Sequence, residues 1–389
     1  MLHSRKQMIV LAGLWSALCL SAQQTSPYIS RVYDYCPAPG QFINVSPEYE
    51  PGDTRDDILR KAEELLAGEE SSLVSLGAYG GYAVFGFDHP VVNVPGQADF
   101  TVPGNVFINP VPGAMSESSE PGIVAVSRDA NGNGLPDDAW YELAGSDYDA
   151  PGTVHRYRIT YYRPDEHKTP VPDPANPALV DTAYIRWTDN LGREGYVSRN
   201  SFHRQPYYPQ WEEADSLVFE GARLADNYTV EGENYVLHAC DWGYADNKPN
   251  ADAGAGFNIE RAVDADGRTV HLPEIHFIKV YTAVNQYCGW LGESSTEIGG
   301  AADLHPDAAG TANRDLQATS SVRILEQPVR DCLRIESPGR QTVRVFSPDG
   351  VCRMSFPVES GLNTVPCSSL PKGFHILVTR DRAIKFSKQ

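Results

Sequence analysis

The sequence predicts an all-β protein: a jelly-roll-like β-sandwich with one short N-terminal helix, followed by a small C-terminal β-sandwich. Short apolar runs recur along the 389 residues, and Pro, Gly, Asn and Asp separate them. Many short strands with turn residues between them are typical of a sandwich or a jelly roll. The helical period of apolar residues is convincing in a single stretch, residues 53–68.

The first 22 residues have the pattern of a secretory signal peptide. His3, Arg5 and Lys6 supply its positive end, and residues 8–20 form an apolar core too short to span a bilayer. The small residues Ser21-Ala22 provide a cleavage site. We therefore expect a secreted or outer cell-surface protein, and no later segment is apolar enough to be a transmembrane helix.

The helix is expected to begin after a capping residue, Asp53 or Thr54, and to end at Gly68. It has one apolar face, made by Ile58, Leu59, Ala62, Leu65 and Leu66. The strands expected around and after it, within a first domain of residues 23–305, are 73–76, 82–87, 100–102, 123–126, 157–162, 183–187, 216–219, 235–239, 257–259 and 275–282. The Gly-rich residues 77–81 are interpreted as bends with close strand approach, and residues 264–267 as a hairpin turn.

Residues 129–138, DANGNGLPDD, are predicted to bind calcium between two strands. Oxygen-bearing side chains stand at loop positions 1, 3, 5 and 9, a glycine stands at position 6, and a main-chain carbonyl is available at position 7. The expected ligands are Asp129, Asn131, Asn133, Leu135, Asp137 and Asp138. Position 12 is Trp140 in place of a bidentate Glu, so the last ligand is Asp138, Glu142 or a more distant group. A turn without metal is the alternative.

A second set of residues is predicted to bind a ligand through aromatic rings. Residues 200–211 are unusually aromatic, and Trp242 and Tyr244 stand in the polar stretch 241–252. The flat faces of Tyr and Trp suit sugars, planar cofactors or protein partners. The candidates are Tyr207, Tyr208, Trp211, Trp242 and Tyr244. If these rings are buried, they are ordinary core residues.

Two further groups of polar residues are weaker candidates for metal binding. One contains Asp246, Asn247, Asn250 and Asp252, and its irregular spacing favours a solvated turn over a second metal site. The other contains Glu293, Glu297 and Asp303, which either complete a metal shell or cap loops.

Charge and cysteine content limit the possible partners. The net charge is −19, and the excess of acidic residues lies before residue 316. A nucleic-acid partner is therefore disfavoured, whereas divalent cations suit the acidic part. Six cysteines follow the signal peptide, too few for a disulfide scaffold. Cys240–Cys288 is the best candidate for a bridge, and a free buried thiol is the alternative.

Residues 306–321 have the small, polar composition of a linker. Alternating strands are expected beyond it, at 332–335, 342–346, 354–356, 364–365, 374–378 and 383–386. This unit, residues 322–389, resembles the sorting domains of exported Bacteroidetes proteins, through VRVFSPDGVCRMSF and LPKGFHILV. The resemblance implies type IX secretion and the cell surface. His375 departs from its pattern.

Residues 27–305 resemble a family of cell-surface proteins from gut Bacteroides. The resemblance rests on YGGYAVFGFDHPVVNVPGQADFTVPGN, SSEPGIVAVSRDANGNGLPDDAWYELAGS, WGYADNKPN and VNQYCGWLGESSTEIGGAADLH. Members of that family are known mainly as surface proteins, so the resemblance implies location and little chemistry.

These observations favour a calcium-stabilised surface protein that captures a glycan or small nutrient beside an outer-membrane importer. A structural or adhesive surface protein is the first alternative. A glycoside-active enzyme is the second. The sequence contains no nucleophile elbow or zinc motif, but a catalytic pair of carboxylates is defined by its three-dimensional geometry and leaves no sequence motif. A corrinoid-binding accessory protein is the third.

Overall fold

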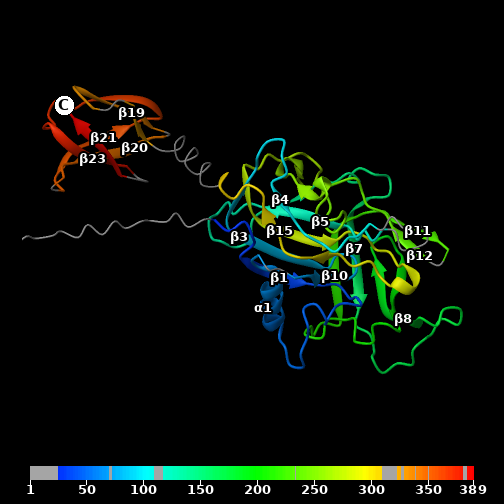
Figure 1. Cartoon of the computed structure of the whole chain (residues 1–389). Helices are drawn as coiled ribbons and strands as arrows, with labels where there is room; N and C mark the ends of the chain where they lie inside the picture. The colour runs from blue at the N-terminus through cyan, green and yellow to red at the C-terminus, as the bar shows by residue number, and fades with distance from the viewer. Residues whose placement is uncertain are drawn as a thin grey trace, which may run out of the picture.

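The computed structural model describes residues 25–69, 72–108, 117–232, 234–308, 322–325, 328–337, 339–348, 350–379 and 383–389. The expected signal peptide, residues 1–22, lies outside these ranges, as does most of the expected linker. Strands make up most of the regular structure, with one α-helix in the described ranges, and the predicted all-β fold class is confirmed (Figure 1).

A six-stranded antiparallel sheet is the centre of the larger unit. Its order is β1 (Arg31–Cys36), β3 (Tyr82–Val92), β15 (Glu274–Thr282), β5 (Gly122–Ser127), β6 (Trp140–Leu143) and β14 (Ala262–Val263). Strand β15 lies between β3 and β5, and Val280 pairs with Ala83 on one side and Val124 on the other. All six residues of β5 are buried, as expected for a central strand.

The helix α1 (Arg55–Leu66) packs against β1 and covers part of the main hydrophobic core. Thr54 is its N-cap and forms a capping box with Asp57, so that both side chains satisfy backbone N–H groups of the first turn. Its buried residues are Ile58, Ala62 and Leu66, three of the five predicted for its apolar face.

Two small sheets of short strands complete this unit around the same core. They are β13 (Gly256–Phe257), β4 (Phe100–Thr101) and β17 (Ala302–Asp303) in one sheet, and β16 (Glu297–Ile298) with β2 (Val74–Ser75) in another. Phe100 and Phe257 stack with ring centroids 5.2 Å apart. Three 3₁₀ turns, η1 (Ala253–Ala255), η2 (Ile259–Arg261) and η3 (Gly289–Leu291), lie in the connections.

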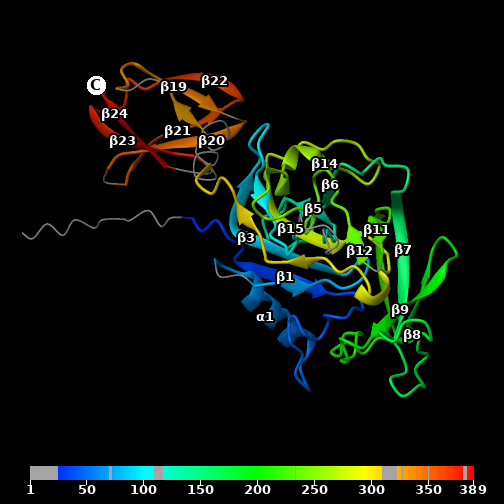
Figure 2. The ribbon, with the colours of Figure 1, turned by 45° about the vertical axis from the view of Figure 1, so that its right-hand side comes forward.

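A four-stranded sheet has a separate core rich in tyrosine. Its order is β10 (Ser216–Arg223), β7 (Val154–Tyr162), β8 (Leu179–Asp189) and β9 (Glu194–Asn200). Figures 1 and 2 both show β7 running steeply across the direction of β1 and β3. The pair β11 (Tyr228–Glu231) and β12 (Asn234–Leu237) forms a hairpin beside it. The core includes Tyr79, which comes from the Gly-rich segment and donates a hydrogen bond to Ala222 O.

The C-terminal strands form two small sheets around a third core. One has the order β18 (Arg323–Ile324), β19 (Cys332–Ser337) and β22 (Gly361–Pro366). The other has the order β21 (Cys352–Val358), β20 (Gln341–Phe346), β23 (Gly373–Val378) and β24 (Ala383–Lys388). His375, the residue that departs from the pattern of the sorting domains, is buried, and its Nε2 lies 2.8 Å from Pro371 O.

No helix in the described part of the chain has both the length and the apolar character needed to span a bilayer. The six cysteines in that part are all free thiols. The suggested Cys240–Cys288 bridge is therefore wrong, and the alternative of free thiols holds. The predicted turn at Asp264 is confirmed, because Gly267 N–H bonds to Asp264 O and Asp264 N–H to Arg268 O.

The Gly-rich segment 77–81 lies where two backbone segments meet, as the sequence predicts. A Cβ built on Gly81 would lie 1.8 Å from Leu76 O and 2.3 Å from Ala38 N. Those two atoms form a 3.0 Å hydrogen bond with each other. A side chain at Gly81 would therefore separate two hydrogen-bonded backbone segments.

We predict that Gly81→Ala destabilises the protein by about 2–3 kcal/mol, because the new methyl group has no space and must displace backbone. Urea denaturation followed by tryptophan fluorescence measures the change. Gly299→Ala is the matched control, since the nearest atoms to its new Cβ lie 3.6 Å away. Equal effects of the two substitutions would contradict this explanation.

Candidate functional site

Three segments that are far apart in sequence meet at one end of β5. Gly122 and Ala245 exchange backbone hydrogen bonds of 2.8 and 2.9 Å, and Glu120 N–H donates to Asp246 O (2.9 Å). The Thr296 hydroxyl donates to Glu120 O (2.9 Å), and Leu76 N–H donates to Thr296 O (3.0 Å). Main-chain bonds thus join the segments of Glu120 and Asp246, and the Thr296 hydroxyl joins the segment of Glu297 to them.

These three acidic residues form a cluster, which we call the carboxylate cluster. One carboxylate oxygen from each of Glu120, Asp246 and Glu297 lies within 4.8 Å of the other two. Asp246 and Glu297 are buried, whereas Glu120 is partly exposed. In the described part of the chain this is the one such group of three His, Cys, Asp or Glu residues.

Backbone N–H groups orient two of these carboxylates. Asp246 accepts from the N–H groups of Asn105 (2.8 Å) and Glu297 (3.0 Å), and Glu120 accepts from Ser295 N–H (3.0 Å). The Asn105 side chain also donates to Glu297 Oε2 (3.3 Å). Residues 295–297 therefore hold the carboxylates of Asp246 and Glu120, and Asn105 holds those of Asp246 and Glu297.

The cluster is unfavourable for negative charge. Burial, together with the neighbouring acids, raises the pKa of Glu120 and of Asp246 well above the ordinary range, and burial raises the pKa of Glu297 to about 7. In the described structure the main influences on these pKa values include no basic residue. Two unit charges 4.8 Å apart repel by about 3 kcal/mol at an effective dielectric constant of ~20. The cluster therefore needs protons or a cation.

Close to the cluster, a cavity of about 460 Å³ opens to solvent, and we call it the aromatic cavity. Glu120 and Glu297 belong to its wall, together with Glu293. Its apolar lining is Phe42, Phe107, Phe202, Leu237, Trp290 and Leu291, and its other polar lining is Gln41, Asn105, Ser118, Asn200, His203, Cys288 and Ser294. Three rings at its mouth are unusually exposed for phenylalanine: Phe42 at 36%, Phe107 at 42% and Phe202 at 64%.

Two carboxylate oxygens of the cavity wall are buried without a hydrogen-bond partner: Glu293 Oε2 and Glu297 Oε1. The hydroxyls of Ser75 and Ser295 lie near enough to Glu297 to lower its pKa, but neither donates to Oε1 with good geometry. Glu293 Oε1 accepts from Gln41 N–H (2.6 Å), and burial raises the pKa of Glu293 to about 8. Unpartnered buried oxygens are costly, so the wall is suited to a ligand that donates hydrogen bonds or carries positive charge.

Cys288 also belongs to the cavity wall and is 1% exposed. Burial raises the pKa of its thiol to about 12. A thiol that keeps its proton at neutral pH is a poor nucleophile, so this side chain serves as part of the wall.

Hydrogen bonds between its own side chains and its backbone fix the conformation of the predicted calcium loop, residues 129–138. Asp129 accepts hydrogen bonds from the N–H groups of Gly132 (2.7 Å), Asn133 (3.1 Å) and Gly134 (2.9 Å). These bonds lower the pKa of Asp129. The positive φ of Gly134, +73°, allows the sharp turn that the sequence predicts at this position.

Other predicted ligands of this loop also lie together. Asn131 Nδ2 and Asn133 Nδ2 both donate to Asp137, at 3.0 and 2.9 Å, and Asp138 accepts from Ala130 N–H (2.9 Å). Leu135, predicted to ligate through its carbonyl, has its N–H bonded to Asn133 Oδ1 (2.8 Å). Calcium at this loop stays a prediction, and binding it would require the two amide groups to give up their bonds to Asp137 and direct oxygens at the ion.

The predicted aromatic binding face is wrong for four of its five residues. Tyr207, Tyr208, Trp211 and Tyr244 are between 0% and 8% exposed and belong to three different hydrophobic cores. The Tyr207 and Tyr208 rings fill the core of the four-stranded sheet, where Arg199 and Arg163 lie over them. Composition predicted an aromatic segment, but not which way the rings point.

Trp242, the fifth predicted residue, is partly exposed and lines a different cavity of about 220 Å³. The Arg261 guanidinium lies 3.6 Å from the centre of its ring. A stacked arginine occupies the face that a planar ligand would use. A ligand role for Trp242 stays a prediction.

The two weaker polar groups each contribute one residue to the carboxylate cluster: Asp246 from the first and Glu297 from the second. The remaining members have local roles. Asn247 accepts from the Ser119 hydroxyl, Asn250 pairs with Gly104, and Asp252 caps η1. Asp303 lies 3.0 Å from His89. Glu120 was missed, because nothing in its own neighbourhood marks it as a ligand.

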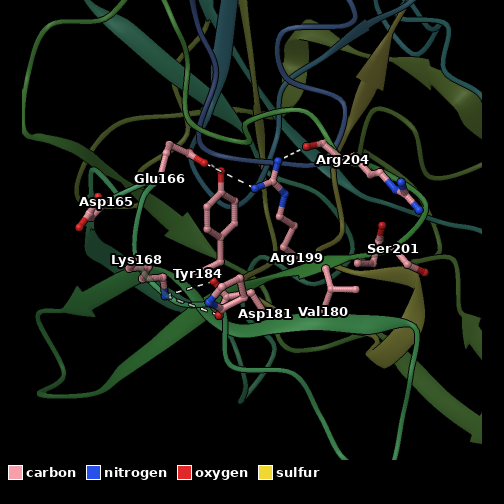
Figure 3. Close-up of a pocket in the computed structure, with 11 residues that line it drawn as sticks. Asp165, Glu166, Lys168, Val180, Asp181, Tyr184, Arg199, Ser201 and Arg204 are labelled. Atoms are coloured by element: carbon pink, nitrogen blue, oxygen red, sulfur yellow. Dashed lines mark hydrogen bonds and ion pairs between the residues drawn. The ribbon is translucent and has the colours of Figure 1, made fainter.

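A further cavity of about 310 Å³, shown in Figure 3, is lined mainly by charged residues. Tyr184 donates to Glu166 (2.5 Å), Arg199 lies 3.5 Å from Glu166, and Lys168 lies 3.2 Å from Asp181. In these pairs, drawn with dashed lines in Figure 3, each charged group has a partner of opposite charge. The aromatic cavity differs because its wall contains unpartnered carboxylate oxygens.

Comparison with known proteins adds little to this description. No protein-family model matches the chain, and no curated protein matches it. A solved structure titled "Biofilm associated protein - BSP domain" aligns with 77% of this chain and 53% of its own, at 11% identity and a TM-score of 0.18. At that TM-score the likeness carries no argument, and the site is interpreted from its own geometry.

A partly buried acid outside the cluster allows a pH test. Glu142 on β6 lines another cavity, and burial raises its pKa from 4.5 to about 7. Between these values the folded protein holds a proton that the unfolded chain has lost. Stability therefore falls as the pH rises through this window.

We predict that Glu142→Gln removes this fall. The variant should match wild type near pH 4 and exceed its stability by roughly 1–3 kcal/mol at pH 8. Urea midpoints measured at both pH values test this, with exposed Glu213→Gln as the control. An equal gain for the variant at both pH values would contradict the pKa assignment.

Proposed function

We propose that this is an exported or cell-surface binding protein that captures a glycan or similar polyhydroxylated nutrient in the aromatic cavity. The observation that carries the proposal is the coexistence of exposed rings and unpartnered carboxylate oxygens in one cavity. Sugar rings have apolar faces that stack on aromatic side chains, and their hydroxyls donate to carboxylate oxygens.

The dimensions and rigidity of the cavity support this proposal. A volume of about 460 Å³ falls in the range of small-molecule sites. Gln41 connects three parts of the wall: its Nε2 donates to Leu291 O (2.7 Å), its Oε1 accepts from Asn200 (2.7 Å), and its N–H donates to Glu293. A wall held in this way binds a ligand with little loss of conformational entropy.

The aromatic mouth supports capture of a ligand over a purely structural role. Phe202 and Trp290 meet edge to face with centroids 6.4 Å apart, and Phe42 meets His203 at 4.7 Å. Exposed apolar patches are rare on soluble proteins unless they bind something. Export is supported by the N-terminal signal pattern, and an outer-membrane importer as partner is part of the same proposal.

We predict that Trp290→Ala weakens glycan binding at least tenfold, because the largest ring of the cavity is lost. The wild-type protein is first screened on a glycan array, and its best ligand is then titrated calorimetrically into both proteins. Tyr196→Ala is the matched control, since Tyr196 is 45% exposed on β9 and is not part of the cavity.

The outcomes separate the candidate functions. Equal loss in the Trp290 and Tyr196 variants would place binding outside the cavity. No response to glycans, with saturable binding of cobalamin in a parallel titration, would favour the corrinoid alternative. No response to either would overturn ligand capture and leave a structural or adhesive role.

The proposal includes calcium as a structural ion in the loop 129–138, which joins two strands of the large sheet. We predict that a chelator lowers the Tm of wild type, and that Asp129→Asn with Asp137→Asn reduces this loss by a few degrees. Asp264→Asn with Asp266→Asn is the control, because this double substitution also removes two negative charges, but from an acidic turn outside the loop. An identical chelator response in all three proteins would remove calcium from this loop.

A further inference from the structure

We propose that Glu120, Asp246 and Glu297 bind one divalent cation of the calcium type at the wall of the aromatic cavity. This site is distinct from the loop 129–138 and does not depend on whether the cavity binds a glycan. The argument rests on the spacing of the oxygens, the unpartnered oxygen of Glu297 and the chemistry of the residues.

The spacing suits a shared ion. The three carboxylate oxygens lie within 4.8 Å of one another. Calcium takes oxygen ligands at about 2.3–2.6 Å, so two oxygens on opposite sides of one ion lie roughly 4.6–5.2 Å apart. The cluster therefore has the dimensions of a coordination shell without moving its backbone.

Glu297 provides the observation that points to a ligand. It is only 7% exposed, its Oε1 has no hydrogen-bond partner, and its carboxylate is part of the cluster. Glu293 Oε2, in the same wall, is also unpartnered. A buried carboxylate oxygen without a donor or counter-charge calls for an explanation, and a bound ion is one that also offsets the clustered negative charge.

The residue types select the class of ion. The cluster offers only oxygens, which suit calcium, magnesium or manganese, and no thiolate or imidazole, which zinc prefers. Three carboxylates supply three to six ligand oxygens, and an ion of the calcium type takes 6–8. Glu120 and Glu297 face the cavity, so water or a ligand hydroxyl can complete the shell.

The backbone around the cluster is built for this arrangement. Asp246 has φ of +49°, a conformation that few non-glycine residues adopt. A Cβ on Gly104 would lie 2.2 Å from Asp246 Oδ1, so glycine is needed there for the carboxylate to occupy its place. Both features hold Asp246 against its neighbours in spite of like charge.

Shared protons are the competing explanation, since they also relieve the repulsion. The two explanations differ in their response to Glu297→Gln. In chelator, Glu297→Gln removes one of three like charges, so both explanations expect the free energy of unfolding to be unchanged or higher. Only the cation explanation requires that the same substitution abolish calcium binding.

The test uses the purified chain, stripped with EDTA and titrated calorimetrically with calcium chloride and, separately, magnesium chloride. Asp129→Asn with Asp137→Asn is the background in which the loop cannot contribute. We expect this background to retain one calcium-binding event and a Tm rise of about 5 °C at saturating calcium. Adding Glu297→Gln should weaken calcium binding at least 100-fold and remove the rise.

Asp99→Asn in the same background is the matched control, because Asp99 is a buried acid with raised pKa outside the cluster, and it should leave calcium binding unchanged. If Glu297→Gln fails to fold by circular dichroism, Glu120→Gln at the partly exposed position replaces it. Absence of calcium binding in the background protein would overturn the proposal. So would calcium binding that survives both cluster substitutions.

Discussion

The structure of the site depends on hydrogen bonds between segments that are distant in sequence. The reciprocal bonds of Gly122 and Ala245, and the bond from the Thr296 hydroxyl to Glu120 O, place three acidic residues side by side. Acidic side chains would not gather in this way on their own, because each opposes the charge of the others. The energy of the sheet network is used to hold a local arrangement that is unfavourable by itself, a common property of functional sites.

The parts of the fold that follow from local physics could be predicted from the sequence. The Thr54 cap, the apolar face of α1 and the turn at Asp264 each depend on residues a few positions apart. The same is true of the strands, whose apolar runs are local patterns. The loop 129–138 belongs here too, because its turn is made by hydrogen bonds within ten residues.

The candidate site could not be predicted because its information is not local. Glu120, Asp246 and Glu297 meet only after the sheet has formed. Asp246 and Glu297 each lie in a polar stretch that the sequence marks as a weak metal candidate, but nothing local marks Glu120 or indicates that the three meet. The aromatic residues failed for a related reason. Tyr207 and Phe202 are five positions apart in one aromatic segment, yet the first is fully buried and the second is 64% exposed. Tertiary packing determines which of the two rings is buried, and the residue type alone does not predict it.

The place of β15 in the large sheet also determines the order in which the molecule can assemble. This strand comes late in the larger unit but separates β3 from β5, which come early. A chain that emerges from its N-terminus, from a ribosome or a translocation pore, cannot close this sheet until residue 282 has appeared. Until then β3 and β5 lack their common partner and expose unpaired backbone N–H and C=O groups. Folding is therefore late and dominated by distant contacts, which makes it slow and leaves a long interval for chaperones to act.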